Sequence, residues 1–220
     1  MINIIIFLFT SIIFALPMKK ENVEEFLNAK YSGDTSIVSL YTSDSFFYYH
    51  APYVGLGIKT HYVDGNLLVT KVINESLNNT ISIGDRIHQF NGLVVRKDGI
   101  ETNGPVGEIQ NILITEKADT VFSELKIPLT LLNEKENSDS FLNSIIKYSE
   151  VWYDYDLIIH DFISKKNKVF VHYSWEGSKE KKTIVYYFDA IEIFTIEKKT
   201  GLINKIESRW NELQFRDQFK

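Results

Sequence analysis

The chain of 220 residues contains no cysteine. This absence excludes a disulfide framework, a thiol nucleophile and a thiolate metal site. Basic residues are also in deficit, because the formal net charge is -5 at pH 7. Nucleic acids and anionic membranes favour basic surfaces, so the composition argues against both as general partners. No internal repeat and no low-complexity segment is visible.

The N-terminal apolar run is too short for a comfortable membrane-spanning helix. It covers residues 4–16, whereas a span needs about 20 residues. Pro17 and the pair Lys19-Lys20 follow it, which indicates a secretory signal peptide over residues 1–17. We therefore expect a secreted or otherwise exported protein. An uncleaved N-terminal anchor is the alternative, because no basic residue precedes the run and Ile13 occupies the outer position of the cleavage region.

Residues 18–52 predict two short helices followed by a strand. Apolar residues recur at helical spacing in the first helix, at Val23, Phe26, Leu27 and Tyr31. Gly33 then ends this helix, and Asp34 caps the next one. The aromatic stretch "SFFYYH" ends the segment as a strand.

Residues 53–133 have a different sequence pattern, which predicts short strands and tight turns. Residues 67–73 and 125–132 predict strands, and Asn91-Gly92 predicts a hairpin turn. Residues 106–115 are interpreted as the one helix of this segment.

Residues 134–220 predict a helix followed by long strands. The polar stretch "NEKENSDS" is interpreted as a linker, and Ser138 or Asp139 as the helix cap. Strands are predicted over residues 153–163, 168–176, 183–197 and 202–210. Both faces of the strand "KVFVHYSW" are partly apolar, which is typical of a sheet that packs helices on one side and lines a cavity on the other.

The outer segments resemble the nuclear transport factor 2-like superfamily, in particular its SnoaL-like and ketosteroid-isomerase-like branches. The matching stretches are "FLNAKYSGDTSIVSLYTSDSFFYYHAP", "NKVFVHYSWEG", "YYFDAIEIFTIEKKTGLINKIESRW" and "NELQFRDQF". The resemblance implies an α+β, cone-shaped fold in which a curved antiparallel sheet and helices enclose a pocket. It also implies a pocket for a small hydrophobic ligand, and a homodimer formed through the sheet of this nuclear transport factor 2-like domain.

The segment between them resembles a PDZ domain, on "GLGI" at residues 55–58, "NLLVTKVINES" at 66–76 and "ISIGDRIHQFNGLVV" at 81–95. The resemblance implies a PDZ-like, partly open β-barrel over residues 53–133. This barrel interrupts the nuclear transport factor 2-like domain, whose parts are residues 18–52 and 134–220. Such an insertion is physically reasonable because a PDZ fold has its two chain ends close together and can replace a surface loop of the other domain.

The PDZ resemblance implies a groove for a peptide or protein C-terminus, bound as an added strand. The amides of Leu56, Gly57 and Ile58 would hold the terminal carboxylate. Ile58 and Thr60 would line the groove, and Val106 would begin its helix. The basic residue that commonly precedes the glycine loop is absent here. A folded insert with a closed groove is therefore the alternative.

The isomerase resemblance places the general base on His50 and the protonated acid near Glu192. It places the oxyanion tyrosine on Phe26, which has no hydroxyl group to donate. His160 and His172 come from neighbouring predicted strands, but no ligand spacing supports a metal site. We expect neither metal nor cofactor.

Three functions remain open on the sequence alone. The leading interpretation is a secreted, non-enzymatic binding protein. It would have a peptide groove in the inserted PDZ-like domain and a hydrophobic pocket in the nuclear transport factor 2-like domain. The second is an enzyme acting on a small hydrophobic substrate with His50 as its general base. The third is a dimeric interaction scaffold.

Overall fold

The computed structural model describes residues 18–100, 102, 104–117, 120–181, 184–210 and 218. The predicted signal peptide, residues 1–17, lies outside the described residues. Within them, every helix is too short or too polar to cross a membrane.

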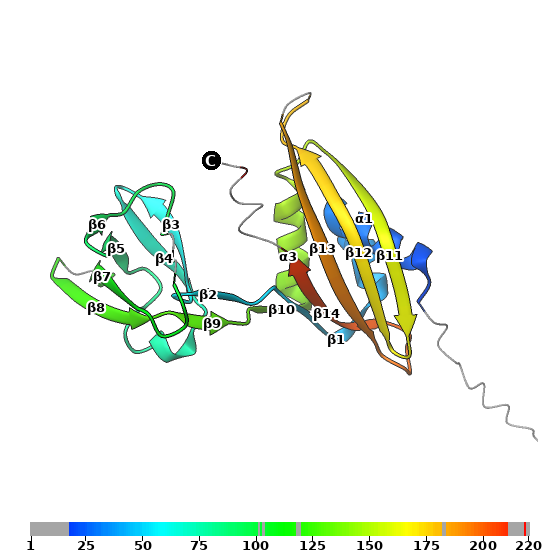
Figure 1. Cartoon of the computed structure of the whole chain (residues 1–220), viewed down its shortest axis with the longest axis horizontal. Coiled ribbons are helices and arrows are strands. Elements are labelled where there is room, and N and C mark those ends of the chain that lie inside the picture. The colour runs from blue at the N-terminus through cyan, green and yellow to red at the C-terminus, as the bar shows by residue number, and fades with distance from the viewer. Residues whose placement is uncertain are drawn as a thin grey trace, which may run out of the picture. The chain divides into compact units, whose positions relative to one another are not determined.

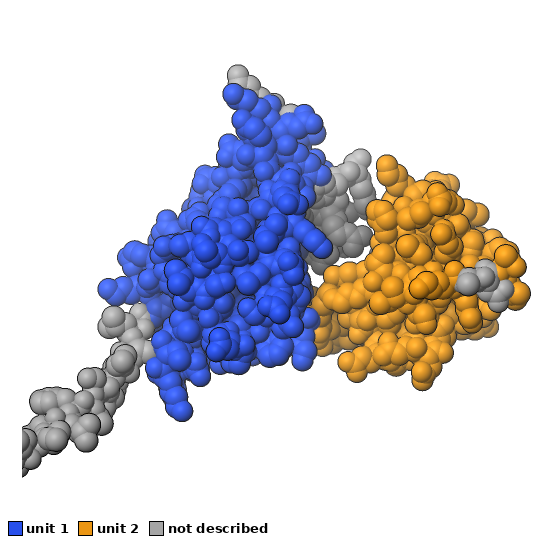
Figure 2. All heavy atoms as spheres, turned by 180° about the vertical axis from the view of Figure 1, so that it is seen from behind, with its two compact units in different colours: residues 1–50, 135–220 blue, residues 51–134 orange. Residues whose placement is uncertain are grey.

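The chain divides into two compact units, coloured separately in Figure 2. Unit 1 comprises residues 1–50 and 135–220, and unit 2 comprises residues 51–134. Each has its own hydrophobic core. The boundaries expected from the sequence, after residues 52 and 133, lie within two residues of these divisions.

The first two helices of unit 1 are joined by a tight corner. Helix α1 (Lys20–Ser32) ends at Gly33, which adopts a left-handed φ of 79° and donates its N–H to the Ala29 carbonyl. Asp34 then caps helix α2 (Thr35–Tyr41), since its carboxylate accepts from the N–H groups of Ser36 and Ile37. Both predictions for this corner are confirmed.

Unit 1 contains one six-stranded sheet in the order β10-β1-β14-β13-β12-β11. Its strands are β1 (Thr42–Tyr49), β10 (Lys135–Asn137), β11 (Asp154–Lys165), β12 (Lys168–Ser178), β13 (Val185–Ile196) and β14 (Ile203–Trp210). The sheet curves around the helices, including α3 (Ser138–Ser149) (Figure 1). This α+β arrangement and the four C-terminal strands agree with the prediction.

The core of unit 1 lies between the helices and the inner face of the sheet. Alternate residues of β12 point into it, so Val169, Val171, Tyr173 and Trp175 are all buried. They meet apolar residues of α1 and α3 in one hydrophobic cluster.

The predicted linker at residues 133–140 is wrong. Lys135–Asn137 form strand β10, which pairs with β1 in an antiparallel register that places Tyr48 opposite Glu136. Asn137, rather than Ser138 or Asp139, caps α3 by accepting from the Ser140 N–H. A polar stretch can be an edge strand because only one of its faces packs on the core.

Unit 2 is built from short strands. These are β2 (Tyr53–Gly55), β3 (Ile58–Val63), β4 (Asn66–Val72), β5 (Arg86–Phe90), β6 (Leu93–Val94), β7 (Ile109–Thr115), β8 (Phe122–Pro128) and β9 (Thr130–Leu132). A 3-10 turn, η1 (Glu75–Leu77), follows β4. The main sheet has the order β3-β4-β5-β7-β8, with β6 beside β5. The predicted Asn91-Gly92 turn connects β5 and β6.

The helix predicted over residues 106–115 is wrong. Ile109–Thr115 form strand β7, paired with β5 on one side and β8 on the other. Gln110, Ile112 and Ile114 are buried while Ile109 and Asn111 are exposed, which is the alternation of a strand. Gly107 has a φ of 91°, which a right-handed helix cannot contain. The main sheet stays open among the described residues, so a PDZ-like barrel is not supported.

Separate cores should give separable unfolding. We expect Phe194→Ala to destabilise unit 1 and Ile87→Ala to destabilise unit 2, each by about 2–5 kcal/mol, because both side chains are fully buried. Differential scanning calorimetry of the full chain should then show two transitions, each shifted by one variant only. A single transition that moves equally in both variants would show that the units do not unfold independently.

Candidate functional site

Unit 1 encloses a cavity of about 160 Å³ between α1, α3 and the inner face of the sheet. A cavity of about 150 Å³ in an apolar core can hold benzene, so this one accommodates a ring-sized molecule. Aromatic and aliphatic side chains form most of the wall: Tyr31, Tyr48, Phe141, Ile145, Tyr148, Tyr173, Phe188, Ala190 and Trp210. The polar lining residues are Lys30, His50, Glu136, Ser144, Glu192 and Ser208.

A buried ion pair lies in this wall. The Lys30 Nζ atom is 2.5 Å from the Oε1 atom of Glu192, and the side chains are 9% and 0% exposed. Lys30 follows Phe26 by four residues and Leu27 by three, so α1 directs it to the same side as these core residues. Glu192 lies between Ala190 and Phe194 in the row of buried residues on the inner face of β13.

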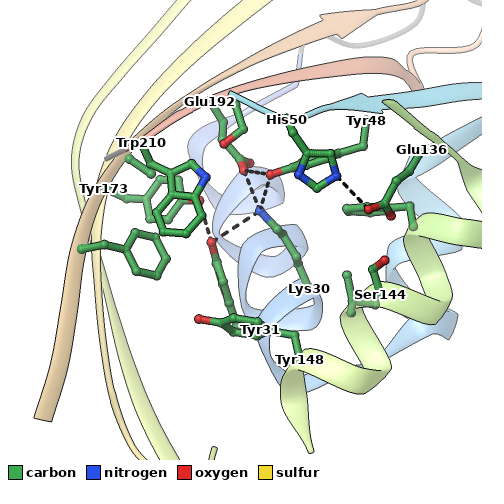
Figure 3. A pocket seen from close by; sticks show the side chains of 15 residues that line it. Lys30, Tyr31, Tyr48, His50, Glu136, Ser144, Tyr148, Tyr173, Glu192 and Trp210 are labelled. Atoms are coloured by element: carbon green, nitrogen blue, oxygen red, sulfur yellow. Dashed lines mark hydrogen bonds and ion pairs between the residues drawn. The ribbon is translucent and has the colours of Figure 1, made fainter. Parts of the chain in front are cut away.

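Tyrosine hydroxyl groups surround the ion pair (Figure 3). The Tyr48 hydroxyl donates to Glu192 Oε1 at 3.0 Å, and the hydroxyls of Tyr31 and Tyr173 are 2.7 Å apart. Burial, and then the negative charge of Glu192, raise the pKa of all three phenols well above the usual value. They therefore remain neutral donors at physiological pH.

The carboxylate of Glu192 is only half satisfied. Its Oε1 atom accepts from Lys30 and Tyr48, but its Oε2 atom is buried without a hydrogen-bond partner among the described residues. A buried charged acceptor without a partner is costly and uncommon in native proteins. Such a group in a native structure calls for a structural or functional explanation.

A second polar pair, His50 and Glu136, lines the same cavity. His50 follows β1 and Glu136 lies on the adjacent strand β10, and the His50 Nε2 atom is 2.7 Å from Glu136 Oε1. The His50 side chain is 33% exposed. Its ring packs edge-on against Tyr48. The other edge of the ring, which carries Nδ1, faces Lys30 and Tyr48 (Figure 3).

The structure brings the two predicted acid–base residues, His50 and Glu192, into one cavity. Phe26 lies in the core against Tyr41 and Phe194, away from the lining. Tyr31, Tyr48 and Tyr173 do bring hydroxyl groups to the cavity lining.

Sequence reasoning missed Lys30 and Glu136. Lys30 carried a usable signal, because it is a charged residue on the apolar face of a predicted helix. Glu136 carried a weaker sequence signal, since it lay in a stretch interpreted as a linker. Its partner His50 is 86 positions earlier in the chain.

The residues predicted to bind a peptide lie in unit 2, where the helix expected to complete their groove is a strand. Leu56 is buried in the core, and the Gly57 carbonyl accepts from the N–H groups of Ile73 and Asn74. Ile58 and Thr60 belong to β3, opposite Val72 and Val69 of β4. Val106 is 58% exposed in a turn, and the helix that it was expected to begin is replaced by β7. No helix of unit 2 among the described residues stands where the second wall of the predicted groove was expected.

His160 and His172 lie outside the cavity. Their rings are 5.0 Å apart, with His160 bonded to Ser174 and His172 near Asp161. Among the residues that the structure describes, no group of three or more histidine, cysteine, aspartate or glutamate residues is arranged to hold a metal ion.

No family model and no curated protein matches the chain. Its structural neighbours are nuclear transport factor 2-like and SnoaL-like proteins that cover most of the chain. A nuclear transport factor 2-like protein of unknown function from Cytophaga hutchinsonii has a TM-score of 0.41 at 10% identity, covering 93% of this chain and 97% of its own.

An epoxide hydrolase of the LEH-like type from M. tuberculosis has a TM-score of 0.41 at 9% identity, covering 90% and 85% of the two chains. A protein from Jannaschia sp. described as a SnoaL-like polyketide cyclase has a TM-score of 0.43 at 7% identity, covering 90% and 91%. Likeness at this level does not identify a function.

Breaking the buried ion pair should be strongly destabilising. We expect Lys30→Met or Glu192→Leu alone to lower the free energy of unfolding by about 3–5 kcal/mol, because each leaves one buried charge unpaired. The double variant should recover most of this loss, since no lone charge remains. Urea titration of the four proteins measures the coupling. Additive losses in the double variant would contradict a direct pair.

Proposed function

We propose that unit 1 binds a compact, largely apolar small molecule that carries a polar group. The observation that carries the proposal is a ring-sized, aromatic-walled cavity whose lining includes a buried Lys30–Glu192 pair. Binding pockets are mostly apolar, with a few placed polar groups that set orientation. The lining of this cavity has that composition.

The energetics support a ligand site rather than a core defect. A buried ion pair in an apolar interior adds little net stability compared with well-packed apolar residues. An open cavity in addition removes packing contacts that a filled core would have. Both features reduce stability at the same place, relative to a core filled with well-packed apolar side chains.

The cavity also has an entrance through which a ligand can pass. His50 is 33% exposed while it lines the cavity, and Ser144 on α3 is an exposed lining residue. A ligand that enters here passes the His50–Glu136 pair before it reaches Lys30 and Glu192.

Blocking the entrance should abolish binding. A library of ring-sized fragments should yield ligands by saturation-transfer NMR with the full chain, and Ser144→Trp should lose them. Asn143→Trp is the matched control, because Asn143 is exposed on the same helix and does not line the cavity. If no fragment binds, or if both variants bind equally, the cavity is not the ligand site.

The second candidate function is acid–base catalysis by His50. Glu136 accepts from His50 Nε2, which leaves Nδ1 as a basic nitrogen on the side of the ring that faces the cavity. A carboxylate that orients a histidine in this way is a recurring arrangement for general bases. The Lys30 ammonium and the Tyr48 hydroxyl could stabilise negative charge that develops on a bound substrate.

Replacing His50 by glutamine should distinguish a role in catalysis from a role in ligand binding. If a bound fragment is converted, or exchanges a carbon-bound proton for deuterium in D2O, His50→Gln should slow that reaction by about 10²–10⁴-fold. Its affinity should change much less, because Gln keeps a polar side chain at the entrance. Proton NMR follows the reaction and the binding in one sample. An unchanged rate in His50→Gln would eliminate His50 as the base.

A further inference from the structure

Lys30 is a primary amine that lines the unit 1 cavity. It is the one buried lysine among the residues that the structure describes, and its side chain is 9% exposed. Its ammonium group points toward Glu192, Tyr48 and Tyr31 within the lining (Figure 3). A lysine nitrogen in an apolar pocket is the group with which proteins form an imine from a carbonyl compound. Lys30 is therefore a candidate nucleophile as well as a charged lining residue.

Glu192 can accept the proton that Lys30 must lose before its nitrogen attacks a carbonyl group. The Glu192 Oε1 atom lies 2.5 Å from Lys30 Nζ, so a short hydrogen bond already joins the two groups. Transfer of the proton converts the buried ion pair into a neutral amine and a neutral carboxylic acid. No new charge is buried in this step, and burying a charge is what an apolar interior penalises most.

The other hydrogen bonds of the Lys30 ammonium group are weak. Such a group has three hydrogen atoms, and one of them is directed at Glu192. The hydroxyl oxygens of Tyr31 and Tyr48 lie 3.4 Å and 3.5 Å from Nζ, whereas a strong charge-assisted bond measures about 2.7–2.9 Å. Imine formation removes two of the three hydrogen atoms. The N–H group that remains can keep the Glu192 contact, so only the two weak contacts are lost.

We propose that the ligand of this cavity is a ring-sized aldehyde, which Lys30 holds as an imine with Glu192 as the counter-ion. The deprotonated nitrogen attacks the carbonyl carbon, and the carbonyl oxygen takes a proton from that nitrogen. The carboxylic acid of Glu192 then returns its proton to the same oxygen, the C–O bond breaks, and water leaves as the C=N bond forms. The aldehyde and the ammonium group thus give a protonated imine and one water molecule, with no change in net charge or oxidation state.

The size of the cavity favours an aldehyde over a bulkier carbonyl compound. A volume of about 160 Å³ admits one ring with a short substituent. An aldehyde has only a hydrogen atom beside its ring at the reacting carbon, whereas a ketone adds a second carbon group there. This inference rests on the proposed function, and it names the substrate class of that site.

Reductive trapping with benzaldehyde tests the proposal on the full chain. Sodium cyanoborohydride reduces a protonated imine to a stable secondary amine, so each reacted lysine keeps a benzyl group that peptide mass spectrometry locates. Lys147, exposed on α3 and outside the lining, gives the rate for a surface lysine in the same sample. We expect Lys30 to be labelled at least about tenfold faster than Lys147, because the cavity holds the aldehyde beside Nζ. Labelling of Lys30 at the rate of Lys147 or below would overturn the proposal.

Two variants test whether the aldehyde reaches Lys30 through the cavity. Ser144→Trp, which blocks the entrance, should reduce the labelling of Lys30 at least about tenfold and leave that of Lys147 unchanged. Asn143→Trp should leave both unchanged, since Asn143 does not line the cavity. Equal labelling of Lys30 in the two variants would show that the reaction does not take place inside the cavity, and would overturn the proposal.

The failures of this proposal and of the proposed function give different results. If Lys30 stays unlabelled while other fragments bind and are lost in Ser144→Trp, the aldehyde class is wrong and the ligand site stands. If Lys30 stays unlabelled and no fragment binds, both are wrong.

Discussion

The contact between Lys30 and Glu192 is the interaction on which the interior of unit 1 depends. It joins the first helix to a central strand across 162 positions of sequence and places two charges where an apolar core would be expected. Three tyrosine hydroxyl groups gather around it, and burial keeps them protonated. The result is a buried polar cluster inside an aromatic wall, next to an open cavity.

The polar groups of the cavity form two pairs with different properties. Lys30–Glu192 is fully enclosed and electrically neutral, so it orients dipoles and donors without attracting ions over a distance. His50–Glu136 is partly exposed, so it can exchange protons with water. A ligand entering the cavity would meet the His50–Glu136 pair before the Lys30–Glu192 pair. This order makes His50 the residue through which binding and any proton transfer would be coupled.

Much of unit 1 could be predicted from the sequence because its signals are local. The alternation in β12 and the Gly33-Asp34 corner depend on neighbouring residues, and both appear in the structure. His50 and Glu192 were identified through a family resemblance, and the structure places both in one cavity. The resemblance points to neither of their partners: Lys30 was recognisable only as a charged residue on the apolar face of a predicted helix, and Glu136 lay in a stretch interpreted as a linker. Unit 2 was predicted less well: the strand Ile109–Thr115 was interpreted as a helix, although its isoleucines at 112 and 114 alternate with polar or half-buried positions.

The central claim is that the cavity beside Lys30 and Glu192 is a ligand site. A crystal structure of the full chain with the tightest fragment from the NMR screen tests this most directly. The account predicts electron density for the fragment inside unit 1, with its ring against Tyr48 and Phe188 and a polar atom within hydrogen-bond distance of His50 or Lys30. Density for the fragment at any other place, with the cavity holding only water or closed by the surrounding side chains, would contradict it.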